Sequence, residues 1–442
     1  MSTLKVNKIR DTSGSTDAIT LDPSGGAVLA GVTTISTARI TTGITTSIQV
    51  GGGVTISESG IEASGIGITC ANINGTQIGG RKNLIINGAM QIAQRATSYT
   101  GGGYETVDRF FVDLAGLDEN PTQAQVDVSS GTTPYTLGFR KAYKITNGNQ
   151  TSGANAGDVI YIKQKIESRN VSNSGWNYTS ASSFVTLQFW IKSSVAQTFT
   201  CHLSTEDGTS YIYNFDTGSL AANTWTKIVK TIPGNSNLEI GNDNGNGLAV
   251  VVNAFAGTNF TDSSTTYDTW TTYSTGIFGG KDNTSTWFTT NDATLEVTGF
   301  QLEVGPQATA FEHRSFGEEL SLCQRYCQVF EGPSNSQGGD SQTALCENCS
   351  LYQANNLFMS IPTKVSMRAK PSMSVATGTQ YYVAYSNGGG VDLDGTNLNM
   401  NGNTGTEFFV INHTVTSLGT SGHSALFRMS NSSAKVTFSA EL

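Results

Sequence analysis

Four cysteines in the last third of the chain have the spacing of a structural zinc site. Three residues separate Cys323 from Cys327, and two separate Cys346 from Cys349. Four thiolates suffice for tetrahedral zinc, and a Cys-x-x-Cys pair can instead form a disulfide. A cysteine that faces a protein core, however, behaves as a small hydrophobic residue. We favour buried or unreacted thiols, and we expect neither a bound metal nor a cofactor.

The residues that could catalyse hydrolysis are scattered along the chain. The four histidines have no accompanying Ser/His/Asp or nucleophile-elbow pattern. Glu206-Asp207 and Asp392-x-Asp394 could supply the two carboxylates of a glycosidase. Both pairs lie among Gly, Thr and Asn, where turns favour Asp for backbone reasons. Asp392-Leu393-Asp394-Gly395 and Asn242-Asp243-Asn244-Gly245 are similar to calcium loops but lack the required spacing and the closing Glu. The sequence therefore predicts a protein that is not an enzyme.

Aromatic side chains are the remaining candidates for recognition, because the flat C–H faces of sugars stack on Trp and Tyr. Trp190 and Trp225 lie within alternating strand patterns and are expected in the core or on a sheet face. Other aromatics lie in stretches rich in Gly, Ser, Thr and Asn, where exposure would need a reason. Core packing is the competing explanation for each of them. The candidate carbohydrate-binding residues are Trp176, Tyr178, Trp270, Tyr273, Trp287, Tyr381, Tyr382 and Tyr385.

The composition of the 442 residues indicates β structure. Only 13% are charged, against about a quarter in an average soluble protein, and small polar residues that favour strands and turns replace them. This argues against a helical bundle and against a charge-rich disordered chain. The net charge of -9 disfavours nucleic acid as a partner. The longest aliphatic run, Leu248 to Val252, is too short to insert into a membrane.

The distribution of aromatic residues divides the chain into three segments. None occurs before Tyr99, and all five tryptophans lie between Trp176 and Trp287. Residues 1–80 alternate β-branched and polar residues, as in Val54–Ser57, but have too few large apolar side chains for a core of their own. A flexible linker is one outcome. We favour an intertwined β shaft, in which three chains share a core and form an elongated homotrimer.

The middle segment, residues 81–314, has the strongest strand patterns. Strands are expected over 184–191, 225–233, 248–252 and 295–304, with turns rich in Gly, Asn and Asp between them. No long helical pattern interrupts them. Many short strands of this kind predict an antiparallel jelly-roll or β-sandwich domain.

The last segment begins with the one short helix that the sequence predicts. Ser315-x-x-Glu318 forms a capping box, apolar residues follow at helical spacing as far as Phe330, and Gly332-Pro333 ends the pattern. We therefore expect a linking helix over 315–331 and a small β tip domain over 332–442. In the tip domain a loop carries Cys346 and Cys349, and strands follow over 357–362, 380–385, 408–411, 425–429 and 434–440.

An ordered series of motifs carries a family resemblance. The motifs are Asn83–Arg95, Val107–Phe110, Phe189–Lys192, Gln301–Pro306 and Phe311–Tyr326. The series resembles bacteriophage tail-fibre and related virion proteins that have a jelly-roll, carbohydrate-binding-module-like domain. The opening 26 residues are similar to the N-termini of fibre-like proteins in marine cyanobacterial phages.

The resemblance implies a protein of the virion, made in the cytoplasm of a host bacterium. Its implied partners are a virion tail or adaptor protein at the N-terminus and host-surface polysaccharide or lipopolysaccharide at the other end. The implied function is host attachment by non-catalytic binding to surface glycan. Two alternatives remain open: a polysaccharide-depolymerising tailspike, and a structural appendage of the capsid or tail hub that has no receptor role.

Overall fold

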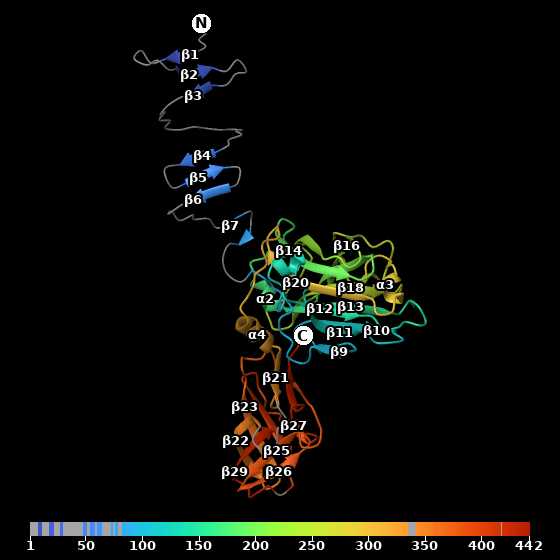
Figure 1. Cartoon of the computed structure of the whole chain (residues 1–442), viewed down its shortest axis with the longest axis vertical. Helices are drawn as coiled ribbons and strands as arrows, with labels where there is room; N and C mark the ends of the chain where they lie inside the picture. The colour runs from blue at the N-terminus through green and yellow to red at the C-terminus, as the bar shows by residue number, and fades with distance from the viewer. Residues whose placement is uncertain are drawn as a thin grey trace. The chain divides into compact units, whose positions relative to one another are not determined.

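The chain divides into two compact units, Met1–Cys70 and Ala71–Leu442. The computed structural model describes residues 82–334, 342–416 and 418–442, together with the backbone of short strands before residue 82 (Figure 1). Among the described residues, no helix is both long enough and apolar enough to cross a membrane.

The first unit contains short antiparallel strands. The sequence-predicted strand over Val54–Ser57 is confirmed as β5, which pairs with β4 and β6. The expected three-chain shaft concerns residues that lie largely outside the described ones. The strands before residue 82 are β1 (Lys8–Arg10), β2 (Asp17–Leu21), β3 (Ala27–Leu29), β4 (Ser47–Val50), β5 (Val54–Ser57), β6 (Gly60–Ala63), β7 (Asn72–Ile73) and β8 (Thr76–Gln77).

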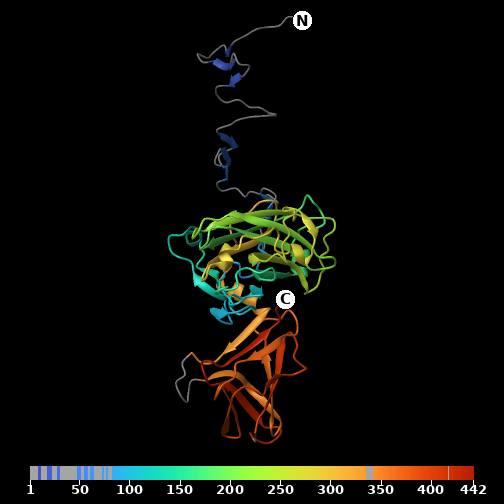
Figure 2. The same ribbon diagram turned by 90° about the vertical axis from the view of Figure 1, so that its right-hand side faces the viewer.

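The middle segment forms the expected antiparallel β-sandwich of two sheets (Figures 1 and 2). The Trp190 sheet has the strand order β17-β14-β20-β12-β11-β9, and the His202 sheet has the order β10-β13-β18-β15-β16-β19. The strands are β9 (Ser98–Thr100), β10 (Phe111–Ala115), β11 (Thr122–Asp127), β12 (Lys141–Thr146), β13 (Val159–Glu167), β14 (Phe184–Ser193), β15 (Thr198–Thr205), β16 (Tyr211–Ser219), β17 (Thr226–Pro233), β18 (Asn246–Ala256), β19 (Trp270–Thr272) and β20 (Thr294–Val304).

Alternation along the strands explains why the two sheets pack together. On β14, Phe189 and Ile191 are fully buried, and on β18 the predicted strand supplies Val250 and Val252 to the same core. The Phe189 ring stacks on Phe300 of β20 at 4.6 Å between centroids. Apolar burial on this scale is sufficient for the sandwich to have its own core.

Single helical turns interrupt the sandwich loops, so the expectation of one helix in the whole chain was wrong. They are α1 (Thr133–Thr136), α2 (Ser168–Ser172), α3 (Thr286–Thr289) and the 3-10 turn η1 (Thr275–Ile277). Each is too short to give a sequence pattern with a period of 3.6 residues.

The linking helix starts where the capping box predicts but is shorter than expected. Helix α4 spans Phe316–Gln324, and the Ser315 hydroxyl accepts a hydrogen bond from the Glu318 amide. Strand β21 (Cys327–Glu331) then begins, because its backbone pairs with β30 near the end of the chain. The apolar residues at 327 and 330 were therefore assigned wrongly to a helix.

The C-terminal domain consists of a three-stranded sheet, β21-β30-β24, and a seven-stranded sheet, β26-β25-β29-β22-β23-β28-β27. Its core includes the stacked pair Phe409 and Phe438, 3.7 Å apart. The predicted loop around Cys346 is instead part of a strand, β22, which pairs with β29 across irregular register. The strands are β22 (Thr343–Gln353), β23 (Asn356–Pro362), β24 (Ser372–Val375), β25 (Tyr382–Ser386), β26 (Gly389–Leu393), β27 (Leu398–Met400), β28 (Phe408–Thr414), β29 (Ser424–Met429) and β30 (Lys435–Ser439).

Candidate functional site

The outer face of the His202 sheet carries polar side chains that the chain itself partly covers. On β15, Cys201 and Leu203 point into the sandwich core, so His202 between them points outward. A segment around η1 crosses this face: Asn214 of β16 donates a hydrogen bond to the Ile277 carbonyl at 3.0 Å. His202 is consequently only 1% exposed, although it lies on the outer face of its sheet.

Next to this cover lies a cavity of about 190 Å³, the His202 pocket. Its aromatic wall is formed by Tyr161, Tyr273 and Phe278, with Phe278 4.6 Å from Tyr161 and 4.8 Å from the His202 imidazole. Polar groups form the remaining surface. The complete lining is Tyr161, Lys163, His202, Ser204, Thr205, Glu206, Ser210, Val251, Tyr273 and Phe278.

The His202 pocket contains a neutral imidazole, and both a cation, Lys163, and an anion, Glu206, line it. Burial, assisted by the nearby Lys163 ammonium, lowers the pKa of His202 to about 3 despite a hydrogen bond to the Phe278 backbone that favours the charged ring, so the ring is uncharged at physiological pH. The His202 Nδ1 atom has no hydrogen-bond partner among the described residues. A buried polar atom without a partner costs about 1–3 kcal/mol. His202 therefore lines the pocket, and its Nδ1 atom has no hydrogen-bond partner within the described part of the fold.

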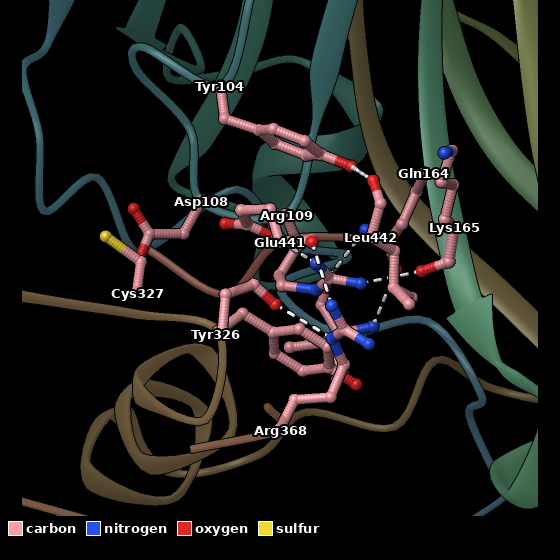
Figure 3. Close-up of polar contacts among 12 residues, drawn as sticks. Tyr104, Asp108, Arg109, Gln164, Lys165, Tyr326, Cys327, Arg368, Glu441 and Leu442 are labelled. Carbon is pink, nitrogen blue, oxygen red and sulfur yellow. Dashed lines mark hydrogen bonds and ion pairs between the residues drawn. The ribbon is translucent and has the colours of Figure 1, made fainter. Parts of the chain in front are cut away.

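A second polar region lies where the sandwich meets the C-terminal domain, and Arg109 is at its centre (Figure 3). We call this cluster the Arg109 junction. The Arg109 guanidinium is 1% exposed and pairs with the Glu441 carboxylate. It also donates to the Lys165 carbonyl at 2.7 Å and lies 3.5 Å from the centroid of the Tyr326 ring.

Other contacts of the junction are also made within the chain. Glu167 of β13 is fully buried and accepts two hydrogen bonds from Arg325, at 2.7 and 2.9 Å. Arg368 holds the backbone carbonyls of Ala440 and Glu441 at 2.8 and 3.0 Å. Because these charged groups pair with one another across the two domains, the junction joins the domains.

Asp108 lies at the edge of the junction. It accepts a hydrogen bond from the Gln94 amide at 2.9 Å. Burial raises the pKa of Asp108 to about 6, despite the hydrogen bonds from Gln94 that favour its charged form.

Four of the aromatic residues predicted from the sequence are buried. The side chains of Trp176, Trp270 and Trp287 are at most 7% exposed, and Tyr382 is fully buried. Each of the three indole N–H groups donates to a backbone carbonyl, those of Ser183, Pro233 and Thr294 respectively. These side chains pack inside their domains and offer no surface to a ligand in this structure.

The other four predicted residues are partly exposed but are not brought together. Tyr178 packs against the sandwich core, and its hydroxyl donates to the Ile240 carbonyl at 3.3 Å. Tyr381 packs against the core of the C-terminal domain, and Tyr385 lines a separate cavity beside Arg428. Tyr273, 39% exposed, lines the His202 pocket.

The other pocket residues were missed, although the sequence contained a signal for some of them. The alternation of Ile160 and Ile162 with Tyr161 and Lys163 predicts a strand with a polar and aromatic outer face. Neither the cover by the η1 segment nor the inclusion of His202 could be read from local spacing.

The described cysteines are free thiols, all buried. The Cys349 thiol donates to the Cys346 carbonyl at 3.3 Å. Among the described residues, no three of His, Cys, Asp or Glu gather as metal ligands would. The four-thiolate arrangement considered from the sequence is therefore not formed.

No protein-family model and no curated protein matches the sequence. Among solved structures, the enzymatically active domain of tailspike protein 4 of bacteriophage CBA120 aligns with 50% of this chain at 10% identity and a TM-score of 0.28. The alignment spans only 21% of that tailspike chain.

Two carbohydrate-binding modules are also similar. A family 11 module from Clostridium thermocellum, in complex with a β-1,3-1,4-mixed-linked tetrasaccharide, has 12% identity and a TM-score of 0.22 over 49% of this chain and 98% of the module. A family 61 module in complex with β-1,4-galactotriose has 10% identity and a TM-score of 0.22, over 50% of this chain and 98% of the module. Scores this low carry no functional argument.

Proposed function

We propose that this chain is a phage tail fibre that attaches to a host cell by non-catalytic binding of a surface glycan. In this proposal the His202 pocket holds one sugar ring. The observation that carries it is a cavity in which three aromatic rings lie beside polar side chains, among them the buried His202 imidazole, whose Nδ1 atom has no partner among the described residues.

The lining of the pocket complements a sugar in three respects. Tyr161, Tyr273 and Phe278 provide apolar ring surface for C–H groups. Sugar hydroxyls both donate and accept hydrogen bonds, and they can be satisfied by His202 and the polar groups beside it. The cavity is smaller than the roughly 300–1,000 Å³ that encloses a drug-sized ligand, so it suits a single ring of a longer chain. Lys163 and Glu206 together favour an uncharged sugar.

The role in the virion is supported by the ordered sequence motifs and by the aromatic-free N-terminal segment. A trimer carries three copies of the pocket, which raises avidity without any new contact. Light scattering on the purified protein tests this part of the proposal, and a stable monomer under native conditions would overturn it.

The glycan-binding proposal is tested by titrating the protein with polysaccharide fractions from the host envelope. We expect Tyr273→Ala to bind about tenfold more weakly, which corresponds to about 1.4 kcal/mol. Tyr352→Ala is the matched control, because Tyr352 is 67% exposed and lies in the other domain. Equal binding by both variants would contradict the proposal. Release of reducing ends from the polysaccharide would instead favour the depolymerising tailspike.

A further inference from the structure

The sandwich has a second cavity, on the outer face of the opposite sheet. This Trp190 pocket has a volume of about 210 Å³. Its wall is rich in aromatic rings: Phe139 lies 4.8 Å from Phe311 and 5.2 Å from the ring of His313. The complete lining is Leu137, Phe139, Gln188, Trp190, Lys227, Gly299, Thr309, Ala310, Phe311 and His313.

A glycine allows the aromatic rings to meet over the backbone. Gly299 interrupts the pairing of β20 with β14 and has a φ of +69°. A Cβ atom at this position would lie 2.8 Å from the Phe139 ring and 3.2 Å from Cδ1 of Trp190. The absence of a side chain therefore creates room that any other residue would fill.

The indole of Trp190 differs from the buried indoles described above. Its neighbours Phe189 and Ile191 point into the core, so Trp190 faces outward and is partly exposed. The three buried tryptophans each donate their N–H group to a carbonyl, whereas Trp190 makes no such bond to any described residue. A ring that is partly exposed and keeps a free donor can both stack on a ligand and bond to it.

The charge of the Trp190 pocket is positive. Lys227 lies directly opposite Trp190 on β17, is exposed, and has no ion-pair partner among the described residues. On the same sheet, Lys192 is paired with Glu296 at 2.9 Å. No carboxylate lines the cavity within the described part of the chain.

The carboxylate of the buried acid Glu303, on the same sheet, is held by hydrogen bonds within the chain. Glu303 accepts from the Gln301 side chain at 2.9 Å and from the Thr309 amide at 2.8 Å. The Lys227 ammonium is thus left available to an outside anion.

We propose that the Trp190 pocket binds a sugar residue that carries a negative group. The ring stacks on the Trp190 indole, and the carboxylate or sulfate approaches Lys227. This second site does not depend on the His202 pocket, whose mixed charge suits an uncharged sugar. A chain with both sites holds two residues of different charge on opposite faces of one domain.

The test is calorimetric titration of the full chain with D-glucuronic acid, D-glucose 6-sulfate and D-glucose. We expect the two acids to bind more tightly than glucose, and added salt to reduce this preference. A preference for only one acid identifies the anionic group as a carboxylate or a sulfate. Equal binding of all three sugars would overturn the proposal.

Four variants, one of them a matched control, locate the site. Lys227→Met should remove the preference for the acids, and its matched control, Lys370→Met on the C-terminal domain, should keep it. Trp190→Ala should weaken all binding at this site about tenfold. Tyr273→Ala should leave the preference for the acids unchanged. This variant therefore distinguishes failure of the proposal for the His202 pocket from failure of the proposal for the Trp190 pocket. If Lys227→Met retains the preference, or if light scattering shows that Trp190→Ala disrupts an oligomer without affecting sugar binding, the proposal is wrong.

Discussion

The Arg109 junction and the His202 pocket both bury polar side chains, but they differ in whether those side chains have partners within the chain. At the junction, Arg109 meets Glu441, and Arg325 meets Glu167, so each charge finds its counterpart in another part of the same chain. In the pocket, the Nδ1 atom of His202 has no such partner among the described residues.

This difference distinguishes residues that stabilise the fold from residues that could bind a ligand. A buried ion pair is costly to break because the remaining charge stays desolvated. A buried neutral group without a partner has the opposite property, since removing it relieves a cost. The two regions should therefore respond in opposite directions to substitution.

The largest effect is expected at the junction. Arg109→Met should lower the free energy of unfolding by about 3–5 kcal/mol, because Glu441 remains buried without its main partner. The midpoint of urea unfolding measures this change. Arg428→Met is the matched control, since its bidentate pair with Glu347 is partly exposed and should contribute about 1 kcal/mol or less. Similar losses in both variants would remove the distinction between buried and exposed pairs.

The next effect concerns pH. The folded protein raises the pKa of Asp108 from 3.8 to about 6, so between these values it binds a proton more tightly than the unfolded chain does. The contribution of Asp108 to stability therefore falls as pH rises through this window, by up to about 3 kcal/mol. Asp108→Asn lacks this contribution.

Unfolding midpoints of the wild type and Asp108→Asn, measured at pH 4 and pH 7, test this prediction. Relative to the wild type, the variant should have a lower free energy of unfolding at pH 4 than it has at pH 7. A difference that does not change with pH would show that Asp108 keeps an ordinary pKa in the fold.

The smallest effect is expected in the pocket, and with the opposite sign. His202→Leu removes a buried atom without a partner and should leave stability unchanged or raise it by about 1 kcal/mol. It should also weaken glycan binding, because the imidazole is then lost to the ligand. Thermal unfolding measures the change in stability, and titration with host-envelope polysaccharide fractions measures the change in glycan binding, both on one preparation of the variant. A large loss of stability would show that His202 stabilises the fold, as the residues of the Arg109 junction do, and would contradict the prediction.

Much of the fold was predictable because strand alternation is a local signal. The patterns at 184–191 and 295–304 became β14 and β20, and the Ser315 capping box marked the start of α4 correctly. The end of α4 was missed because β21 is fixed by pairing with β30, more than a hundred residues away. The strand β22 was missed for a related reason: its irregular register disrupts alternation.

The candidate site was harder to predict, and the tryptophans show why. Trp287 lies among Thr, Ser and Asn and was a candidate for sugar binding, with core packing as the competing explanation. Its loop folds against the sandwich core, so packing is the outcome. Trp190 lies in a clear strand and was expected in the core or on a sheet face, and it lies on the outer face of its sheet, where it lines a pocket. Local composition indicates which segments form loops, but the tertiary structure determines which of their side chains are covered.

The C-terminal domain is joined to the sandwich by the chain itself and by polar contacts from several segments, including the pair of Asn244 with Arg368. The chain enters the domain through Arg325 and β21, and the segment after β30 returns Glu441 to Arg109 and Arg95. Because these contacts lie apart from the covalent link, the domain cannot turn about that link without breaking them.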